Sequence, residues 1–254
     1  MKNNKSLGQH WLKNREILDE IAFLSLPEGR EADLCVEIGP GLGTLTSSLL
    51  KNYPEVVAVE YDENLARNLP KSFPGKNLQV FNEDILKFDF NTIKIPFTVA
   101  GNIPYYITSP IIQKLLYLNP QPLQIALLIQ KEVAERIAAG AGDHTVLSLT
   151  VQNRAEVALG PVVKKDQFTP PPKVDSRVIV LTPKKPTVSE NVIELAKIGF
   201  KNPRKKLTAN LSSLGLKKDE LASLLEKNGI NPSARPAELK LKDWEILAKN
   251  LHKR

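Results

Sequence analysis

Six short apolar runs, rich in β-branched residues, recur between residues 34 and 181. They cover residues 34–38, 56–60, 78–81, 97–100, 123–129 and 177–181. Their apolar positions are mostly continuous, which is typical of strands that are buried on both faces of a sheet. Between them, segments such as TLTSSLLKN and KEVAERIAA have the spacing of amphipathic helices. This alternation predicts an α/β fold with an open, mostly parallel sheet.

The pattern changes at TPKKPTVSE, residues 182–190, which contains two prolines. After this stretch every segment with regular spacing is helical, namely ENVIELAKIGF, RKKLTANLSSL, KDELASLLEKN and KDWEILAKNL. The change predicts a domain boundary near residue 185. We expect a large α/β domain over residues 1–184 and a small all-helical domain over residues 185–254.

Length and composition fit a globular protein, since 42% of the 254 residues are hydrophobic and 25% are charged. No apolar run approaches the roughly 20 residues of a membrane span. The first residues, MKNNKSLGQHWLKN, lack the apolar core of a signal peptide, and Cys35 is the single cysteine. A cytoplasmic protein without a membrane segment is expected. The three histidines lack metal-ligand spacing, so no metal site is expected.

The positive charge is concentrated at one end of the chain. Residues 184–254 hold 16 of the 35 basic and 8 of the 28 acidic side chains, so the remainder is close to neutral. Such a basic end is typical of a region that binds a polyanion, although a solvated lysine-rich surface has the same composition. Within it, Lys201, Arg204, Lys205 and Lys206 precede a predicted helix, where the helix dipole does not favour cations. They are candidate phosphate contacts, with an exposed basic turn as the alternative.

A glycine-rich loop, VEIGPGLGTLT, follows the first predicted strand and opens a helix. Gly39, Gly41 and Gly43 have the spacing G-x-G-x-G, whereas the dinucleotide fingerprint places its third glycine one residue later, at Thr44. The loop therefore fits a smaller adenosine ligand better than NAD. No P-loop motif is present in the sequence.

Polar side chains follow the next three predicted strands, at the edge where open α/β sheets bind ligands. Glu60 can accept hydrogen bonds from both ribose hydroxyls, and Asp84 from an adenine amino group. Asn102 follows the fourth strand. In this order the residues predict a site for S-adenosylmethionine. Glu37 can stabilise the loop, with or without contact to a ligand.

The stretch NIPYY, residues 102–106, is suited to methyl transfer onto an aromatic amine. The Asn102 side-chain oxygen and a backbone carbonyl in Ile103–Pro104 can accept the amine hydrogens and stabilise the developing positive charge. Pro104 stiffens the turn, and Tyr105 can stack on a base. Tyr106 is expected to pack. Because a paired base cannot enter such a pocket, the target must be flipped or single-stranded.

Five motifs together resemble the ribosomal RNA adenine dimethyltransferases, from about residue 5 to the C-terminus. They are KSLGQHWL, VEIGPGLGTLT, NIPYYITSP, LLIQKEVAERIAA and FTPPPKVDS. The resemblance implies a Rossmann-like, S-adenosylmethionine-dependent catalytic domain and a helical domain that docks on RNA. It also implies dimethylation of two adjacent adenines near the 3′ end of small-subunit (16S) rRNA, in an immature 30S-type particle during ribosome biogenesis.

The resemblance also implies roles for individual residues. It assigns Gln9, His10 and Leu12 to the methionine end of the cofactor, in a segment where the family often has Asn-Phe instead of His10-Trp11. It assigns catalysis to Asn102, with Phe168 stacking on the flipped base opposite Tyr105. The other cofactor residues that it implies are Gly39, Gly41, Glu60 and Asp84.

Three alternatives remain at this level. A non-catalytic RNA-binding assembly factor would keep the fold, although the intact Asn102 and Tyr105 argue against it. A large-subunit rRNA adenine methyltransferase that confers antibiotic resistance shares NIPY, but the segment SARPAELKLKDWEILA favours the small-subunit group. A DNA adenine methyltransferase would act on duplex DNA. A monomer is expected, because no dimer seam is evident in the sequence.

Overall fold

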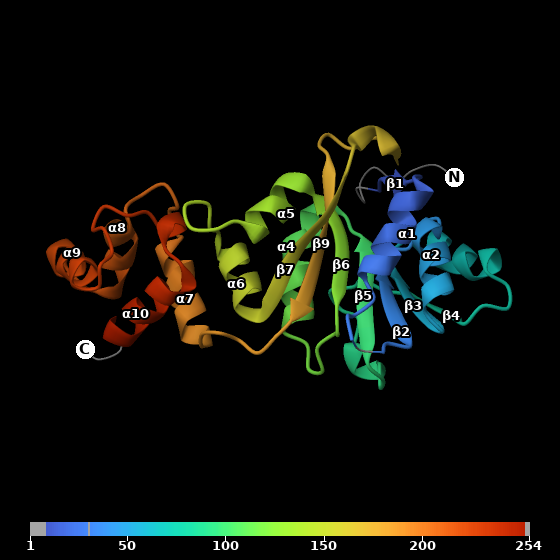
Figure 1. Cartoon of the computed structure of the whole chain (residues 1–254), viewed down its shortest axis with the longest axis horizontal. Helices are drawn as coiled ribbons and strands as arrows, with labels where there is room; N and C mark the ends of the chain where they lie inside the picture. The colour runs from blue at the N-terminus through green and yellow to red at the C-terminus, as the bar shows by residue number, and fades with distance from the viewer. Residues whose placement is uncertain (1–8, 30, 252–254) are drawn as a thin grey trace. The chain divides into compact units, whose positions relative to one another are not determined.

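The computed structural model describes residues 9–29 and 31–251. Residues 5–8, which begin the first of the five motifs, lie outside the described residues. The described chain divides into two compact units (Figure 1). One contains the residues up to Glu135 together with Glu156–Pro183, and the other contains Arg136–Ala155 together with the residues from Lys184 onward. Each unit has its own hydrophobic core.

The first unit is built on a seven-stranded sheet of order β4-β3-β2-β5-β6-β9-β7. Its strands are β2 (Leu34–Ile38), β3 (Glu55–Glu60), β4 (Leu78–Asn82), β5 (Phe97–Asn102), β6 (Ile125–Gln130), β7 (Ala155–Val163) and β9 (Ser176–Pro183). Neighbouring strands from β4 to β6 are parallel, and β9 is antiparallel to β6. The central strands are apolar along most of their length because both faces of the sheet are covered. The predicted Rossmann-like α/β fold is confirmed.

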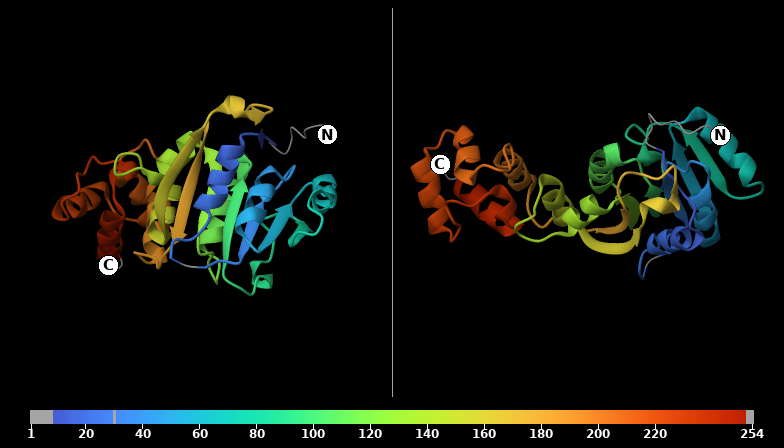
Figure 2. Two further views of the ribbon diagram at one scale, coloured as in Figure 1. Left: turned by 45° about the vertical axis from the view of Figure 1, so that its right-hand side comes forward. Right: turned by 90° about the horizontal axis from the view of Figure 1, so that it is seen from above.

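Helices cover both faces of this sheet (Figure 2). They are α1 (Arg15–Leu24), α2 (Thr44–Asn52), α3 (Glu63–Asn68), α4 (Thr108–Leu116) and the start of α5 (Lys131–Ala138), with short 3₁₀ helices at Leu69–Ser72, Phe90–Thr92, Tyr105–Ile107 and Lys165–Gln167. Helix α1 begins after Asn14, whose side chain accepts a hydrogen bond from the Ile17 amide. Its apolar stripe, Leu18, Ile21 and Ala22, is buried in the core of the unit.

A second, two-stranded sheet joins the N-terminal segment to a distant part of the first unit. Strand β1 (Trp11–Leu12) pairs antiparallel with β8 (Phe168–Thr169), so that Trp11 faces Thr169 and Leu12 faces Phe168. Leu12 and Phe168 are both buried in the core of the first unit. This pairing fixes the position of the residues before α1, which periodicity alone does not predict.

The second unit is helical. It contains α6 (Val146–Arg154), α7 (Glu190–Gly199), α8 (Leu207–Leu211), α9 (Lys218–Lys227) and α10 (Leu241–Leu251), with 3₁₀ turns at Ser212–Leu214 and Pro236–Glu238. Trp244 is fully buried, and a Cβ on Gly199 would lie 2.2 Å from its ring, so glycine is required there. The helical composition of the C-terminal region was predicted correctly.

The predicted domain limits differ from the structure in one respect. Residues 136–155 group with the helical unit rather than with the sheet. The reason is that Leu149 of α6 is completely buried in the core formed by α7, α8 and α10. The chain passes from one unit to the other after residues 135, 155 and 183. The boundary predicted near residue 185 corresponds only to the last of these three positions.

The register of the parallel strands brings their carboxyl ends together. Ile38 at the end of β2 pairs with Val59 of β3 and with Gly101 of β5, and Glu60 pairs with Asn82 of β4. A Cβ on Gly101 would lie 2.9 Å from the Ile38 carbonyl oxygen, so glycine permits this close approach. The loops after these four strands therefore open on one edge of the sheet. Within residues 9–29 and 31–251, none of the helices has the length and apolar character that a membrane span requires.

Candidate active site

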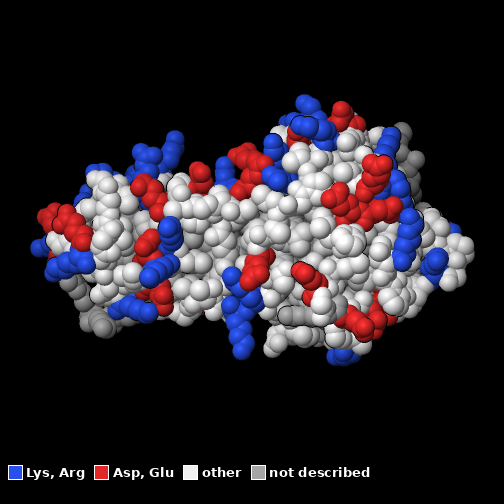
Figure 3. Space-filling view, viewed as in Figure 1, with Lys and Arg blue, Asp and Glu red and all other residues white. Residues whose placement is uncertain are grey.

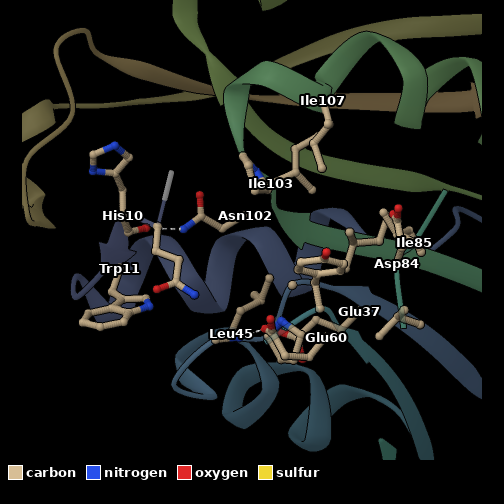
Figure 4. Close-up of a pocket in the computed structure, with 18 of the residues that line it drawn as sticks. His10, Trp11, Glu37, Leu45, Glu60, Asp84, Ile85, Asn102, Ile103 and Ile107 are labelled. Carbon is tan, nitrogen blue, oxygen red and sulfur yellow. Dashed lines mark hydrogen bonds between the residues drawn. The ribbon is translucent and has the colours of Figure 1, made fainter. Parts of the chain in front are cut away.

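A cavity of about 330 Å³ lies at this edge of the sheet (Figure 4). It is lined by residues from the N-terminal segment and from the loops after β2, β3, β4 and β5. Nine of the predicted site residues line it: Gln9, His10, Gly39, Gly41, Glu60, Asp84, Asn102, Pro104 and Tyr105. The prediction that the strand ends share one site therefore agrees with the geometry.

The glycine loop has the backbone conformation that the sequence pattern requires. Gly39, Gly41 and Gly43 have φ values of 64°, 58° and 81°, a left-handed region that other residues adopt only with strain. A Cβ on Gly39 would meet no atom within 4 Å, so the backbone itself borders open space at the cavity. A Cβ on Gly43 would lie 2.8 Å from the side chains of Leu69 and Phe73. The loop thus exposes backbone to a ligand on one side and packs tightly on the other.

Glu60 joins two of the loops that border the cavity. One carboxylate oxygen accepts a hydrogen bond from the Gly41 amide at 3.0 Å, and the other accepts one from the Asp62 amide at 2.8 Å. Burial raises the pKa of Glu60, and these two amides oppose that effect. A carboxylate has about four lone-pair sites, so acceptor capacity remains for a ligand with two hydroxyl groups.

Glu37 lies beneath the glycine loop and is almost completely buried. One of its oxygens accepts a hydrogen bond from the Thr46 hydroxyl at 2.6 Å, while Oε1 is buried without a hydrogen-bond partner. Burial raises the pKa of Glu37 to about 8. The side chain therefore anchors the first turn of α2 through Thr46.

The loop that carries Asp84 is held by Lys114, a residue that the sequence patterns do not indicate. Within this loop, Asp84 accepts a hydrogen bond from the Leu86 amide at 2.9 Å, which closes the turn after β4. Lys114 of α4 donates to the carbonyl oxygens of Leu86, at 2.9 Å, and Phe88, at 2.7 Å. The pKa of Lys114 is lowered by desolvation. Its ammonium therefore fixes the loop that carries Asp84, through contacts 26 and 28 residues apart in sequence.

Asn102 has a fixed amide orientation. Its Nδ2 donates a hydrogen bond to the backbone carbonyl of His10 at 2.9 Å (Figure 4). Because a carbonyl can only accept, the amide nitrogen must face His10 and the side-chain oxygen must face away from it. Asn102 therefore presents Oδ1 as an acceptor at the cavity.

The aromatic side chains near Asn102 come from two chain segments. The rings of His10 and Tyr105 face one another with centroids 6.1 Å apart, and His10 Nδ1 donates to the Pro170 carbonyl at 2.8 Å. The Tyr105 hydroxyl is hydrogen-bonded to Ser176 at 2.7 Å, and burial raises the pKa of Tyr105. The prediction that Tyr106 packs is wrong, because its side chain is 64% exposed at the cavity.

Other predicted site residues lie elsewhere. Leu12 and Phe168 are buried side by side in the core and are not among the described residues that line the cavity. Their assigned contacts with cofactor and base stay predictions. Lys201, Arg204, Lys205 and Lys206 lie in the helical unit, where all four are exposed. Over the part of the chain that the structure describes, no cluster of three or more potential metal ligands is found.

The family model described as "Ribosomal RNA adenine dimethylase" matches residues 1–253. The ribosomal RNA small subunit methyltransferase A of Nostoc punctiforme is 41% identical, over 97% of this chain and 94% of the relative. The protein of the same name from Dehalococcoides mccartyi (strain ATCC BAA-2100 / JCM 16839 / KCTC 5957 / BAV1) is 36% identical, over 97% of this chain and 88% of the relative.

Two solved structures have the same fold over almost the whole chain. A dimethyladenosine transferase from Plasmodium falciparum has a TM-score of 0.80 at 29% identity, covering 96% of this chain and 98% of its own. The 23S rRNA methyltransferase ErmE has a TM-score of 0.74 at 26% identity, covering 95% and 99%. The resemblance seen in the five motifs is confirmed: the chain belongs to the ribosomal RNA adenine dimethylase family.

Proposed function

We propose that this chain transfers methyl groups from S-adenosylmethionine to the 6-amino groups of two adjacent adenines near the 3′ end of 16S rRNA. The substrate is an immature 30S-type particle, and the reaction accompanies ribosome biogenesis in the cytoplasm. The observation that carries the proposal is the fixed acceptor Oδ1 of Asn102 in the same cavity as Glu60 and Asp84. The names of the relatives support the small-subunit substrate.

The residues of the cavity fit S-adenosylmethionine. Glu60 retains lone pairs for the ribose hydroxyls, Asp84 can accept from the adenine amino group, and Gly39 leaves backbone open at the cavity. When bound, S-adenosylmethionine supplies a methyl group that is already activated as a sulfonium. The protein then needs to align the reactants and stabilise charge, without a covalent nucleophile.

Asn102 would act on the target amine through hydrogen bonds. The lone pair of the adenine 6-amino nitrogen is delocalised into the ring, so the free amine is a poor nucleophile. An N–H bonded to Asn102 Oδ1 and a second bonded to a carbonyl of Ile103–Pro104 draw the nitrogen toward tetrahedral geometry and stabilise its developing positive charge. Nitrogen gains the methyl group and releases one proton to solvent, because a carboxamide is not a base.

The same contacts explain how two transfers can occur and then stop. After the first transfer the amine retains one N–H, which can still bind Asn102 Oδ1. After the second transfer no N–H remains, and the anchoring hydrogen bond can no longer form. The described residues of one chain supply every contact used here, so a monomer is sufficient for the proposed reaction.

The exposed basic turn at Lys201–Lys206 is proposed as an RNA contact. Lys201, Arg204 and Lys205 extend from the surface, and Lys206 is hydrogen-bonded to Ser233 at 3.1 Å. Figure 3 shows Lys and Arg side chains distributed over the helical unit, with acidic side chains between them. Because phosphate contacts dominate the affinity for nucleic acids, this turn is suited to bind the rRNA backbone.

A methyl-transfer assay on three substrates tests the proposal. The purified chain is incubated with S-adenosylmethionine carrying a labelled methyl group and with unmodified small-subunit particles, unmodified large subunits or duplex DNA. We expect label in small-subunit particles only, recovered as N6,N6-dimethyladenosine by nucleoside mass spectrometry. Label in large subunits or in duplex DNA would support one of the other methyltransferases. Binding of small-subunit particles without label would support the assembly factor.

A further inference from the structure

Ser176, the last residue of the motif FTPPPKVDS, makes a side-chain contact with the wall of the cavity. Its hydroxyl is hydrogen-bonded to the hydroxyl of Tyr105 at 2.7 Å. Tyr105 lines the cavity, whereas Ser176 is completely buried and is not among the described residues that line it. Ser176 can therefore reach a substrate only through the tyrosine.

The backbone on both sides of Ser176 is anchored. Ser176 begins β9, which pairs with β6 in the sheet (Figure 1). The Asp175 carbonyl accepts a hydrogen bond from the Lys131 amide at 3.0 Å. The Arg177 guanidinium donates to the Gly160 carbonyl at 3.1 Å. The Ser176 hydroxyl is therefore held in place by the sheet and can fix a partner that has more freedom.

Tyr105 is such a partner. It begins a 3₁₀ helix of only three residues, Tyr105–Ile107, and its side chain has two rotatable bonds before the ring. Among the residues that the structure describes, Ser176 is the one hydrogen-bond partner of its hydroxyl. The facing ring of His10 is held from the same motif, through the Pro170 carbonyl. The motif therefore restrains two rings that border the cavity.

The plane of the Tyr105 ring matters because Asn102 Oδ1 is fixed. A base that stacks on a ring takes its position from the plane of that ring. If the Tyr105 ring rotates, the base moves relative to the Asn102 oxygen, and its amine is no longer aligned for transfer. A misplacement of about 1 Å can slow a reaction by about 100-fold. Stacking and hydrogen bonding therefore depend on each other at this site.

We propose that Ser176 is a positioning residue that holds the Tyr105 ring in the plane on which the target adenine stacks. This inference rests on the proposed function and on the stacking of the flipped adenine on Tyr105 that the sequence predicts. It gives the motif FTPPPKVDS a role that does not depend on Phe168, which is buried in the core.

A double-mutant cycle on methyl transfer tests the inference. Ser176→Ala and Tyr105→Phe remove the same hydrogen bond from opposite ends, and the phenylalanine keeps a ring for stacking. In single-turnover transfer to unmodified small-subunit particles, we expect each variant to be about tenfold slower than the unmodified chain. The double variant should be no slower than the slower single variant, because one bond is lost in each case. Calorimetric affinity for S-adenosylhomocysteine should be unchanged in all three.

A matched control lies in the same unit. The hydroxyl of Ser25 is hydrogen-bonded to that of Tyr53 at 2.9 Å, and both residues are buried. Neither is among the described residues that line the cavity. Ser25→Ala should lower the melting temperature, as Ser176→Ala should, but it should leave the transfer rate unchanged. Equal slowing by the two alanine variants would overturn the inference, because it would indicate a general loss of stability.

The remaining outcomes separate the inference from the proposed function. Transfer by Ser176→Ala at the rate of the unmodified chain would overturn the inference alone. Additive losses for Ser176→Ala and Tyr105→Phe would do the same, since the two hydroxyls would then act independently. If Ser176→Ala does not fold, an undiminished rate for Tyr105→Phe would overturn it. If the unmodified chain transfers no methyl groups to the particles, the proposed function fails and the inference fails with it.

Discussion

The side-chain amide of Asn102 donates to the backbone carbonyl of His10 across 2.9 Å, a contact between residues 92 positions apart. It leaves the side-chain oxygen of Asn102 as the acceptor at the cavity. The N-terminal segment is held in turn by the pairing of β1 with β8 and by the bond from His10 to Pro170. The acceptor that we propose for catalysis is therefore oriented by backbone from a distant part of the chain.

Replacing Lys114 should weaken cofactor binding through Asp84. Lys114→Met removes both hydrogen bonds to the loop that follows Asp84, and we expect a loss of affinity for S-adenosylhomocysteine of roughly three- to tenfold. Asp84→Asn should reduce affinity on its own, and by a smaller factor when Lys114 is already methionine. A double-mutant cycle by calorimetry measures this coupling. Strictly additive free energies for the two substitutions would contradict the link between Lys114 and Asp84.

Stability should depend on pH through Glu37. Its pKa rises from 4.5 to about 8 on folding because of burial. Between these values the folded chain holds a proton that the unfolded chain has released, so stability falls as the pH rises through that range. Glu37→Gln lacks this proton uptake, and its melting temperature relative to the unmodified chain should increase from pH 5 to pH 8. A constant difference in melting temperature across this range would contradict the assignment.

The exposed ring of Tyr106 should contribute to RNA binding. It is 64% exposed beside Tyr105, and stacking of a base on an aromatic ring contributes about 1–3 kcal/mol. Tyr106→Ala should raise KM for the small-subunit particle at least several-fold without changing the affinity for S-adenosylhomocysteine. Tyr106→Phe, which keeps the ring, should behave like the unmodified chain. Equal KM values for the alanine and phenylalanine variants would exclude stacking.

The basic turn should determine the salt dependence of RNA binding. Neutralising Arg204, Lys205 and Lys206 to glutamine should lower the affinity for RNA. It should also reduce the slope of log K against log salt, by about 0.7 for each phosphate that the turn no longer neutralises. A matched control replaces Lys217, Lys218 and Lys227, which are also exposed in the helical unit. If both triple variants change the slope equally, the turn has no special role.

Hydrophobic periodicity predicted most strands of the seven-stranded sheet, but it predicted neither β7 nor the separate sheet formed by β1 and β8. Strand β2 was predicted with its observed bounds, and β3 to within one residue, because their buried runs are continuous. Strand β7 was missed, since AEVALGPVV contains Gly160 and Pro161 and is only partly buried. Strands β1 and β8 are two residues long, and their pairing across more than 150 residues leaves no periodic signal.

The sequence could identify those site residues that lie at the carboxyl end of a predicted strand. Glu60, Asp84 and Asn102 were found in this way, because parallel strands bring their carboxyl ends to one edge. Lys114 was not found, since its partners are backbone carbonyls that any residue carries. The hydrogen bond between Tyr105 and Ser176 also required coordinates, because the two residues are 71 positions apart in the sequence.

The most direct test of the account compares chemistry with binding in Asn102→Ala. Single-turnover transfer of labelled methyl groups to unmodified small-subunit particles is measured together with calorimetric affinity for S-adenosylhomocysteine. The account predicts that the variant still binds S-adenosylhomocysteine but transfers methyl groups about 100-fold or more slowly, as expected for loss of an interaction that stabilises transition-state charge. Transfer at the rate of the unmodified chain would contradict the role of the Asn102 oxygen.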